Sequence, residues 1–474
     1  MGRRDQEGGY RAGIAICPGT HMHQPPAFDD SPLDPGAAGI PWTLSTLMKG
    51  VPQSFDGLAR SAVAAQAASV TAQDLPFPVA TLRRSALQGN SAWFQALMRE
   101  RGAELAPHGK TTMSPELFAL QADGGCWALT LATFHQVRVA RAAGWRRILL
   151  ANEAVGKQEL AYYIAELNAD PSFDFYLYVD SVEGVERLRA AMQAHGATRP
   201  LQVLLEVGYA NGRCGVRNVE DALRVCQAVR ATQGALQLMG VSGFEGLNQY
   251  GGPADREVNA RTFLRHLADI VREVDRQQYF DGALTLVSAG GSAFYDLVLA
   301  ELGTLALARP HRVVVRSGCY LTHDNLLYRS LQGEVEERLG LDAAASGSDA
   351  SAGRPGLRLR PAIEVWGQVI SAPDDQTVIL CAGRRDYGQD AGNPVPTRWF
   401  QAKLGRWGAL PPQLRVGMVS DQHTNLTTEP GHRIEVGDLI CLGVSHPCTT
   451  FDKWQVLYVI DEDSTVVDAV RTWF

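Results

Sequence analysis

One lysine and one histidine–cysteine pair are the residues of this sequence whose types and spacing are best suited to chemistry. Lys110 stands in the segment Pro107-His108-Gly109-Lys110-Thr111-Thr112. A lysine amine that is partly withdrawn from water can form a Schiff base with an aldehyde. Gly109-Lys110-Thr111 is similar to part of a phosphate-binding P-loop, but Glu104 stands where that motif needs its first glycine. The P-loop is therefore excluded, and the alternative for Lys110 is a solvated surface lysine.

The second candidate is the pair His446 and Cys448 in Ser445-His446-Pro447-Cys448. In extended backbone, residues i and i+2 point to the same side, so an imidazole and a thiolate at this spacing can bind one ion. Nitrogen and sulfur donors favour zinc, and two protein ligands would leave positions for water and substrate. The alternative is a buried thiol beside an ordinary histidine.

The elements that must position these residues are short apolar runs alternating with segments of helical period. Continuous apolar strands separated by helices predict a parallel sheet that is covered on both faces. Eight such units match a (β/α)8 barrel, which typically takes about 250 residues. An open doubly wound sheet is the alternative, but the sequence lacks a glycine fingerprint after its first strand. The eight expected strands are Ala103 to Ala106, Ala128 to Ala132, Arg147 to Leu150, Phe173 to Val179, Leu201 to Val207, Leu236 to Val241, Ala283 to Val287 and His311 to Val315.

A barrel of this kind places its chemistry where each strand ends. Ser288-Ala289-Gly290-Gly291-Ser292 follows the seventh strand, and its glycines would let backbone N–H groups approach a phosphate. A Gly-Gly pair taken alone is more often a simple turn. The polar residues at the other strand ends are Lys110, Thr133, Asn152, Asp180, Arg213, Glu245 and the segment Arg316-Ser317-Gly318-Cys319-Tyr320.

Four parts of the chain are expected. Residues 1–75 form an irregular extension, in which Ser61 to Ala72 is the only helical stretch. Residues 76–340 form the barrel, which ends on a helix over 325–339. Residues 341–356 are rich in small side chains and predict a flexible loop. Residues 357–474 are rich in short apolar strands and closely spaced turns, which predicts an all-β second domain.

Composition excludes several classes of protein. The chain has 474 residues, with 44 Lys and Arg against 51 Asp and Glu, and its formal net charge is −7. A mildly acidic chain is not expected to bind nucleic acid, because such binding depends on basic residues that neutralise phosphates. No apolar run approaches the roughly 20 residues that cross a bilayer. Eight cysteines without a CxxC pair are typical of reduced thiols in the cytoplasm.

The segment Ala106 to Met113 resembles the Pro-His-x-Lys-Thr segment of the D-serine dehydratase and D-threonine aldolase family. The resemblance implies an alanine-racemase-type barrel with a β-domain, and pyridoxal 5'-phosphate carried on Lys110. Leu205 to Val216 is similar to the family segment whose arginine approaches the phenolic oxygen of the cofactor. This implies that role for Arg213, and the alternative is a salt bridge within the loop.

Further residues receive roles from the same resemblance. Ser288, Gly290, Gly291 and Ser292 resemble the loop that holds the cofactor phosphate. The segment from Arg316 resembles a Gly-Ser-Tyr segment, which implies that Tyr320 lies near the phosphate or the ring. Cys319 is then expected to be a small packed side chain rather than a nucleophile.

The resemblance also identifies the His446–Cys448 pair as a metal site. His-x-Cys is the form of zinc-dependent D-serine dehydratases, whereas the aldolases more often show His-x-Asp. His423 falls where the family has another active-site histidine, which implies a catalytic role. The family also implies a head-to-tail homodimer, in which His446 and Cys448 would face the partner subunit's Lys110.

The activity that follows from the resemblance is dehydration and deamination of a D-3-hydroxy amino acid, either D-serine or a β-substituted relative. The products are a 2-oxo acid and ammonia. Retro-aldol cleavage to glycine and an aldehyde, as in D-threonine aldolase, is an alternative, and racemisation is another. A non-catalytic pyridoxal-phosphate-binding protein belongs to a different class. The large β-domain and the His-x-Cys pair argue against that class.

Overall fold

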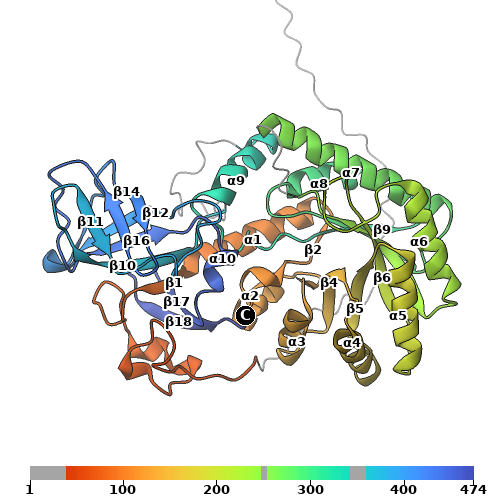
Figure 1. Cartoon of the computed structure of the whole chain (residues 1–474), viewed down its shortest axis with the longest axis horizontal. Coiled ribbons are helices and arrows are strands. Elements are labelled where there is room, and N and C mark those ends of the chain that lie inside the picture. The colour runs from red at the N-terminus through yellow and green to blue at the C-terminus, as the bar shows by residue number, and fades with distance from the viewer. Residues whose placement is uncertain (1–38, 247–252, 342–358) are drawn as a thin grey trace, which may run out of the picture. The chain divides into compact units, whose positions relative to one another are not determined.

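A computed structural model describes residues 39–246, 253–341 and 359–474. Eight parallel strands form one curled sheet in the order β2-β9-β8-β7-β6-β5-β4-β3 (Figure 1). A parallel bridge between His108 and Thr130 joins the two ends of this sheet and closes the barrel. The predicted barrel and all eight of its strands are confirmed. The strands are β2 (Glu104–Leu105), β3 (Leu129–Leu131), β4 (Arg147–Glu153), β5 (Asp174–Val179), β6 (Leu201–Val207), β7 (Leu236–Gly243), β8 (Thr285–Ala289) and β9 (His311–Val315).

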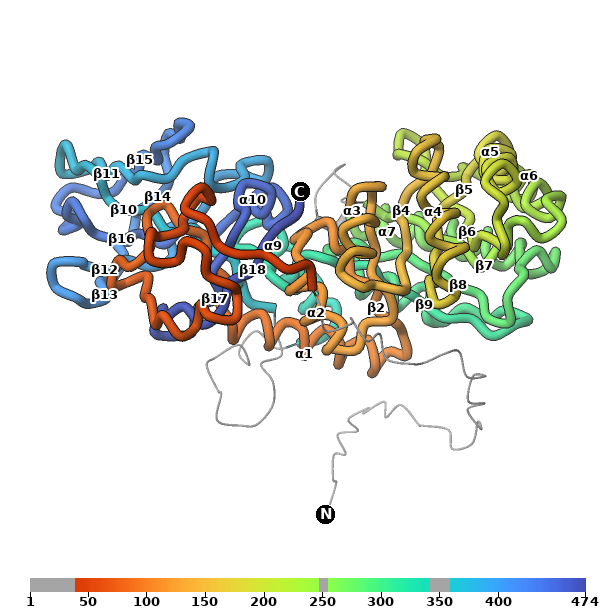
Figure 2. Tube along the Cα trace, turned by 90° about the horizontal axis from the view of Figure 1, so that it is seen from below, coloured from red at the N-terminus to blue at the C-terminus, as the bar shows by residue number. Residues whose placement is uncertain are grey.

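The alternation of side chains along each strand separates the outer core from the barrel interior. On β6, Leu201, Val203, Leu205 and Val207 pack in the main hydrophobic core, and the intervening side chains, including Glu206, point to the opposite side. Helices α4, α5 and α6 flank the strands (Figure 2). The helices are α1 (Arg84–Glu100), α2 (Pro115–Asp123), α3 (Phe134–Ala142), α4 (Lys157–Ala169), α5 (Val182–Ala194), α6 (Val219–Ala231), α7 (Pro253–Arg276), α8 (Tyr295–Leu302) and α9 (Leu327–Arg338).

Side-chain caps fix where three of these helices begin, and α3 and α5 begin directly after the carboxyl ends of their strands. Thr133 accepts a hydrogen bond from the Gln136 backbone amide at the start of α3. Ser181 caps α5 and Asn218 caps α6 in the same way. Such caps satisfy backbone donors that have no partner in the first turn, so each strand-to-helix connection is held firmly.

The C-terminal domain consists mainly of strands, as predicted, and its strand pairs are antiparallel except for β1 with β17. Its central path runs β13-β12-β16-β10-β1-β17-β18, and β11, β15 and β14 extend it from β10. The last helix, α10 (Cys448–Phe451), follows β16 directly. The strands are β1 (Val79–Arg83), β10 (Ile363–Ser371), β11 (Thr377–Leu380), β12 (Val395–Gln401), β13 (Arg406–Gly408), β14 (Arg415–Val419), β15 (Thr424–Thr427), β16 (Leu439–Gly443), β17 (Val456–Ile460) and β18 (Val466–Arg471).

Strand β1 belongs to this second sheet although it precedes the barrel in the sequence. It pairs antiparallel with β10 and parallel with β17. The segment from residue 76, which we expected to open the barrel, therefore contributes its strand to the C-terminal domain. The chain enters the second sheet once before the barrel and returns to it afterwards.

The helix expected over Ser61 to Ala72 is not formed. Two 3-10 turns, Arg60–Ala62 and Ala64–Gln66, replace it, and Ala67 has a positive φ of 49° that ends the second turn. Tertiary packing explains the difference, because Val63, Ala68 and Val70 are buried in a second core with residues of β17 and β18. The described part of the extension therefore packs on the β-domain.

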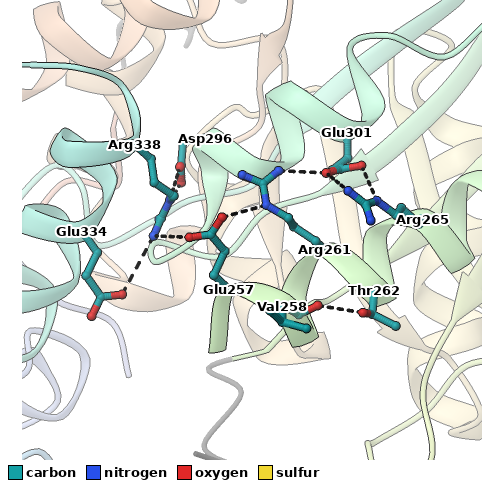
Figure 3. Close-up of polar contacts among 9 residues, drawn as sticks. All are labelled: Glu257, Val258, Arg261, Thr262, Arg265, Asp296, Glu301, Glu334 and Arg338. Atoms are coloured by element: carbon teal, nitrogen blue, oxygen red, sulfur yellow. Dashed lines mark hydrogen bonds and ion pairs between the residues drawn. The ribbon is translucent and has the colours of Figure 1, made fainter. Parts of the chain in front are cut away.

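An ion-pair network joins three outer helices of the barrel (Figure 3). Arg261 on α7 contacts Glu257 and Glu301, each at 2.8 Å, and Glu301 lies on α8. Arg338 on α9 contacts Asp296 on α8 at 2.6 Å. Networked pairs contribute more than isolated surface pairs, so these contacts help to hold the last helices in place.

One sequence expectation falls almost wholly on a segment that the structure does not describe. The flexible loop predicted over 341–356 lies outside the described residues, except for residue 341.

In residues 39–246, 253–341 and 359–474, no helix is both long and apolar enough to cross a membrane.

Candidate active site

Lys110 lies at the mouth of the barrel, on the 3-10 turn Gly109–Thr111 that follows β2. Its side chain is exposed, whereas Gly109 and Thr111 on either side are buried. A Cβ atom at Gly109 would lie 2.9 Å from the Phe118 ring and 3.0 Å from Leu131, so the turn is pressed against its neighbours. The sequence therefore holds the backbone of Lys110 firmly while its amine stays accessible.

A buried arginine ties together the strands behind this mouth. Nη1 of Arg316, at the end of β9, donates to the hydroxyls of Ser242 at 2.8 Å and Ser288 at 2.7 Å. Its Nη2 donates to the Gly243 carbonyl at 2.7 Å, and Ser242 also bonds the Tyr178 hydroxyl at 2.7 Å. These hydrogen bonds thus link strands β5, β7, β8 and β9 around the buried guanidinium of Arg316. The sequence showed Arg316 only as one of several strand-end residues. Its hydrogen bonds to the neighbouring strands could be recognised only in the tertiary structure.

His108 shows that the cationic residues converge at this mouth. Burial and the positive charges of Lys110, Arg316 and Arg213 hold the pKa of His108 well below its usual value. Its Nδ1 atom is buried and has no hydrogen-bond partner in the described chain. Three cationic side chains and an unsatisfied buried nitrogen therefore lie together on this side of the mouth, and these properties suit an anionic ligand.

Arg213 lies on the loop after β6, where the sequence placed it. Its guanidinium carbon is 4.9 Å from the centre of the Phe244 ring, a cation–π contact, and its side chain is exposed. Arg217 holds this loop instead, by donating to the carbonyls of Cys214 and Gly215 at 2.8 and 2.6 Å. Arg213 is thus not needed to hold the loop, and its contact with a cofactor stays a prediction.

The loop Ser288 to Ser292 holds an anionic group in this structure, and that group is the protein's own carboxylate. The amides of Gly290 and Gly291 donate to Glu245 at 3.0 and 2.6 Å. The φ angle of Gly290 is +100°, and a Cβ at Gly291 would lie 2.7 Å from Phe244, so both positions require glycine. Burial raises the pKa of Glu245. The loop therefore has the geometry of an anion cradle, while the phosphate contact itself stays a prediction.

Tyr320 and His423 lie apart from these groups. The Tyr320 ring stacks on Phe94 at 4.3 Å and its hydroxyl accepts from Gln121 at 3.3 Å, so it packs in the main core. This packing places Tyr320 against α1 and α2, and its position near the ring or phosphate, which the resemblance implies, stays a prediction. His423 is exposed on the turn between β14 and β15.

Three potential metal ligands from the two domains meet beside the Lys110 turn. Cys319 follows β9, His446 precedes α10, and Cys448 is the first residue of that helix. Their ligand atoms all lie within 4.8 Å of one another, and the Sγ atoms of Cys319 and Cys448 are 3.6 Å apart. The structure brings the predicted pair together and adds Cys319, which the sequence suggested only as a packed side chain.

A carboxylate orients the histidine of this cluster. His446 Nδ1 is 2.6 Å from Asp390 Oδ2, and Thr449 donates to the other Asp390 oxygen at 2.5 Å. A carboxylate on one imidazole nitrogen leaves the other nitrogen for a metal ion and is the usual support of metal-binding histidines. No sequence motif marks Asp390, so this contact could not be predicted.

Hydrogen bonds and charges within the cluster shift the pKa values of Cys448 and His446 in opposite directions. The hydrogen bond from Cys319 and the charge of His446 hold the pKa of Cys448 well below its usual value, although burial opposes them. Burial lowers the pKa of His446, but hydrogen bonds with Cys448 and Asp390 outweigh it and raise the pKa to about 9. The donor set thus already provides the thiolate that metal binding requires.

Thr111 joins the cluster to the lysine within one chain. Its Oγ1 lies 3.5 Å from Cys448 Sγ and 3.7 Å from Cys319 Sγ, and it directly follows Lys110. The expectation that His446 and Cys448 face the partner subunit's Lys110 is therefore wrong. The reason is that α10 packs on the Gly109–Thr111 turn of its own chain.

This arrangement predicts the behaviour of linked subunits. Two chains fused in tandem, one with Lys110→Ala and one with His446→Ala, are expected to lack activity because neither chain holds a complete site. The matched control fuses a wild-type chain to a Lys110→Ala/His446→Ala chain and is expected to keep about half the activity of a wild-type tandem. Equal steady-state rates for the two fusions would contradict a site within one chain.

A second group of ligand-type side chains lines the mouth, formed by Glu153, Asp180, Glu206 and Cys214. Burial and the neighbouring carboxylate of Glu153 raise the pKa of Glu206 to about 9, Asp180 adds to this rise, and the charge of Arg316 opposes it. Glu206 thus retains a proton near neutral pH, beside a carboxylate.

The raised pKa of Glu206 predicts a pH-dependent stability. A carboxyl with a higher pKa in the folded chain than in the unfolded chain destabilises the fold as the pH rises between those values, here from about 4.5 to about 9. Glu206→Gln in the cofactor-free protein is therefore expected to raise the melting temperature at pH 8 by a few degrees and to leave it unchanged at pH 4.5. The exposed Glu220→Gln is the matched control. A lower melting temperature of Glu206→Gln at pH 8 would contradict this assignment.

Comparison with known proteins defines the class of this chain. Residues 82–312 match the alanine racemase N-terminal domain, and residues 362–460 match the putative serine dehydratase domain. The chain therefore combines an alanine-racemase-type barrel with a serine-dehydratase-type domain, in that order along the sequence.

Individual relatives are lyases. The chain is 26% identical over 397 residues to D-threonine aldolase of Arthrobacter sp, which covers 82% of this chain and 90% of the relative. It is 26% identical over 274 residues to D-threo-3-hydroxyaspartate dehydratase of Delftia sp. (strain HT23), over 57% of this chain and 67% of the relative. The solved D-threonine aldolase from Filomicrobium marinum shares the fold, with a TM-score of 0.66 at 20% identity over 84% of this chain and 95% of that one.

The residues at the mouth fit pyridoxal phosphate, the cofactor of this fold family. An accessible lysine amine, the converging cations and the unsatisfied His108 Nδ1 suit an anionic aldehyde. The three donors beside Thr111 likewise fit a divalent metal ion, because two sulfurs and one imidazole are a known set for zinc.

Proposed function

We propose that this protein is a lyase that dehydrates and deaminates D-3-hydroxy amino acids, D-serine or a β-substituted D-serine, to a 2-oxo acid and ammonia. The observation that supports the proposal is the contact of Cys448 with Thr111, the residue that directly follows Lys110. A site with a lysine-held cofactor can act on the α-carbon, and an adjacent metal can act on the β-hydroxyl of the same substrate.

Each residue has a defined part in this proposal. Lys110 would hold the cofactor and, once the substrate amine has replaced it, would remove the α-proton. Pyridoxal phosphate supplies an electron-withdrawing ring for the substrate when it is bound. Arg213 would approach its phenolic oxygen. Ser288 and the loop Gly290 to Ser292 would lie against its phosphate, and Glu245 orients that loop through the two glycine amides.

The metal side of the site is assigned to His446 and Cys448. Zinc held there would supply a Lewis acid for the departing hydroxyl. An acid–base role for His423 is proposed on the family resemblance alone, since His423 lies apart from the groups described above.

Retro-aldol cleavage is the second candidate function. The relatives include D-threonine aldolase and 3-hydroxy-D-aspartate aldolase as well as the dehydratase, so names alone favour neither reaction. The thiolate of Cys448 favours dehydration, because sulfur selects zinc over manganese or magnesium. A cytoplasmic location, which the cysteine usage indicates, and a homodimer, which the family resemblance implies, are proposed with this function.

The test of this function is a substrate panel with the purified protein supplied with pyridoxal phosphate and zinc. D-Serine and D-threo-3-hydroxyaspartate are expected to release ammonia and a 2-oxo acid in equal amounts. Their L-enantiomers and D-alanine, which lacks the hydroxyl group, serve as controls and are expected to give neither product. Racemisation of D-alanine without ammonia release from any D-3-hydroxy acid would contradict the proposal.

A further inference from the structure

Cys319 is buried against the metal donors, although the sequence gave it no chemical role. It lies on the turn after β9, and 4% of its surface is exposed. Its sulfur is 3.6 Å from Cys448 Sγ, and both sulfurs lie within 4.8 Å of a ring nitrogen of His446. We propose that Cys319 is a third protein ligand of the metal, so that the site is Cys2His with one open position. This inference rests on the metal site of the proposed function.

The separation of the two sulfurs fits a shared ion. Zinc binds thiolates at about 2.3 Å in tetrahedral geometry, which places two thiolates on one ion about 3.8 Å apart. The 3.6 Å between Cys319 and Cys448 is close to that value and far longer than the S–S bond of a disulfide, about 2.05 Å. Small side-chain adjustments would suffice to bind the ion.

The backbone around Cys319 is held in the position that this role requires. Its amide donates to Ser292 Oγ at 3.1 Å. A Cβ at the preceding Gly318 would lie 2.5 Å from the His108 carbonyl oxygen and 2.9 Å from Thr111 Oγ1, so only glycine allows the turn to approach Thr111 so closely. Asp390 supports the histidine from the other domain. Ligands held on both sides by packed backbone are a property of preorganised metal sites.

A third ligand has consequences for substrate and stability. Three protein ligands in a tetrahedral site leave one position, so the substrate would contribute a single oxygen, its β-hydroxyl. The ion would also join the barrel, through Cys319, to the β-domain, through His446 and Cys448. The alternative role of Cys319 is a packed thiol that donates a hydrogen bond to Cys448.

Cobalt substitution and zinc affinity separate these roles. The full-length protein with its cofactor is loaded with Co2+, and thiolate-to-cobalt charge-transfer absorption is recorded for the wild type, Cys319→Ala and Cys319→Ser. Zinc affinity is measured by competition with a chromophoric chelator. Cys226→Ala, a buried cysteine on α6, is the matched control. We expect both Cys319 variants to lose about half of the charge-transfer intensity and to bind zinc about 100-fold more weakly or worse, while Cys226→Ala matches the wild type.

The outcomes distinguish this inference from the function on which it rests. Unchanged cobalt spectra and zinc affinity in Cys319→Ser would overturn the third ligand and leave the two-ligand metal site intact. A wild type that binds neither ion would overturn the metal site of the proposed function and this inference with it. Retained cofactor absorbance in each variant shows that the fold is intact. If Cys319→Ala does not fold, Cys319→Ser is used to test the inference.

Discussion

Replacing Lys110 by alanine is expected to remove the covalent link to pyridoxal phosphate and to lower the rate of 2-oxo acid formation by at least about 10³-fold. The reason is that, in the proposed function, one amine would perform two tasks: it would hold the cofactor and would then remove the α-proton. A positioned acid–base group alone contributes roughly 10²- to 10⁴-fold. No other described lysine is placed on the turn between the converging cations and the metal donors.

The covalent link is measured by borohydride reduction followed by mass spectrometry of peptides. The wild type is expected to carry the label on Lys110, and Lys110→Ala none. Lys157→Ala, which removes an exposed lysine at the start of α4, is the matched control and should behave as the wild type. A reduced label on a different lysine in Lys110→Ala would show that the assignment is wrong.

Removing the metal is expected to abolish formation of the 2-oxo acid while the absorption of the bound cofactor persists. Lys110 lies on the barrel, whereas His446 and Cys448, the proposed metal ligands, belong to the β-domain. A chelator should therefore remove the metal and leave the cofactor bound. Zinc should restore the rate. His446→Ala and Cys448→Ala should lose activity in the same way, by at least about 10²-fold, since a metal site has lost a direct ligand.

The control for these variants is His195→Ala, which removes an exposed histidine at the end of α5. It should keep full activity and zinc content. Full activity in a protein shown by elemental analysis to contain no metal would contradict the role of the ion. Loss of the cofactor together with the metal would instead mean that the two groups do not bind independently.

The barrel could be predicted from sequence because its signal is local. Each strand is an apolar run such as Leu201 to Val207, followed by a segment of helical period, and the pattern occurs eight times. The eighth strand, His311 to Val315, was predicted with the bounds that the structure shows. The C-terminal domain was predicted only as strand-rich, from its short apolar runs and closely spaced turns.

Pairings between distant segments could not be predicted. Strand β1 reads as an ordinary apolar run, and its place beside β10 and β17 depends on residues nearly 300 or more positions away. Ser61 to Ala72 has a helical composition, but burial of Val63 and Val70 against the β-domain overrides it.

The parts of the candidate site that stand in a sequence motif were predicted. The parts that only the tertiary structure brings together were missed. Lys110, His446 and Cys448 stand in recognisable segments. Glu245 was noted as a strand-end residue. The hydrogen bonds that it accepts from the Gly290 and Gly291 amides can be recognised only when β7 and β8 lie side by side. Cys319 resembles a packing residue until the β9 turn meets α10.

The partition of products from D-threonine tests the central claim most directly. With zinc held by a thiolate beside Lys110, the hydroxyl is expected to leave, giving 2-oxobutanoate and ammonia. Both pairs of products are quantified in one reaction, and D-serine is assayed in parallel. The account predicts ammonia and a 2-oxo acid from both substrates. Release of glycine and acetaldehyde from D-threonine, with no ammonia from D-serine or its β-substituted analogues, would contradict it.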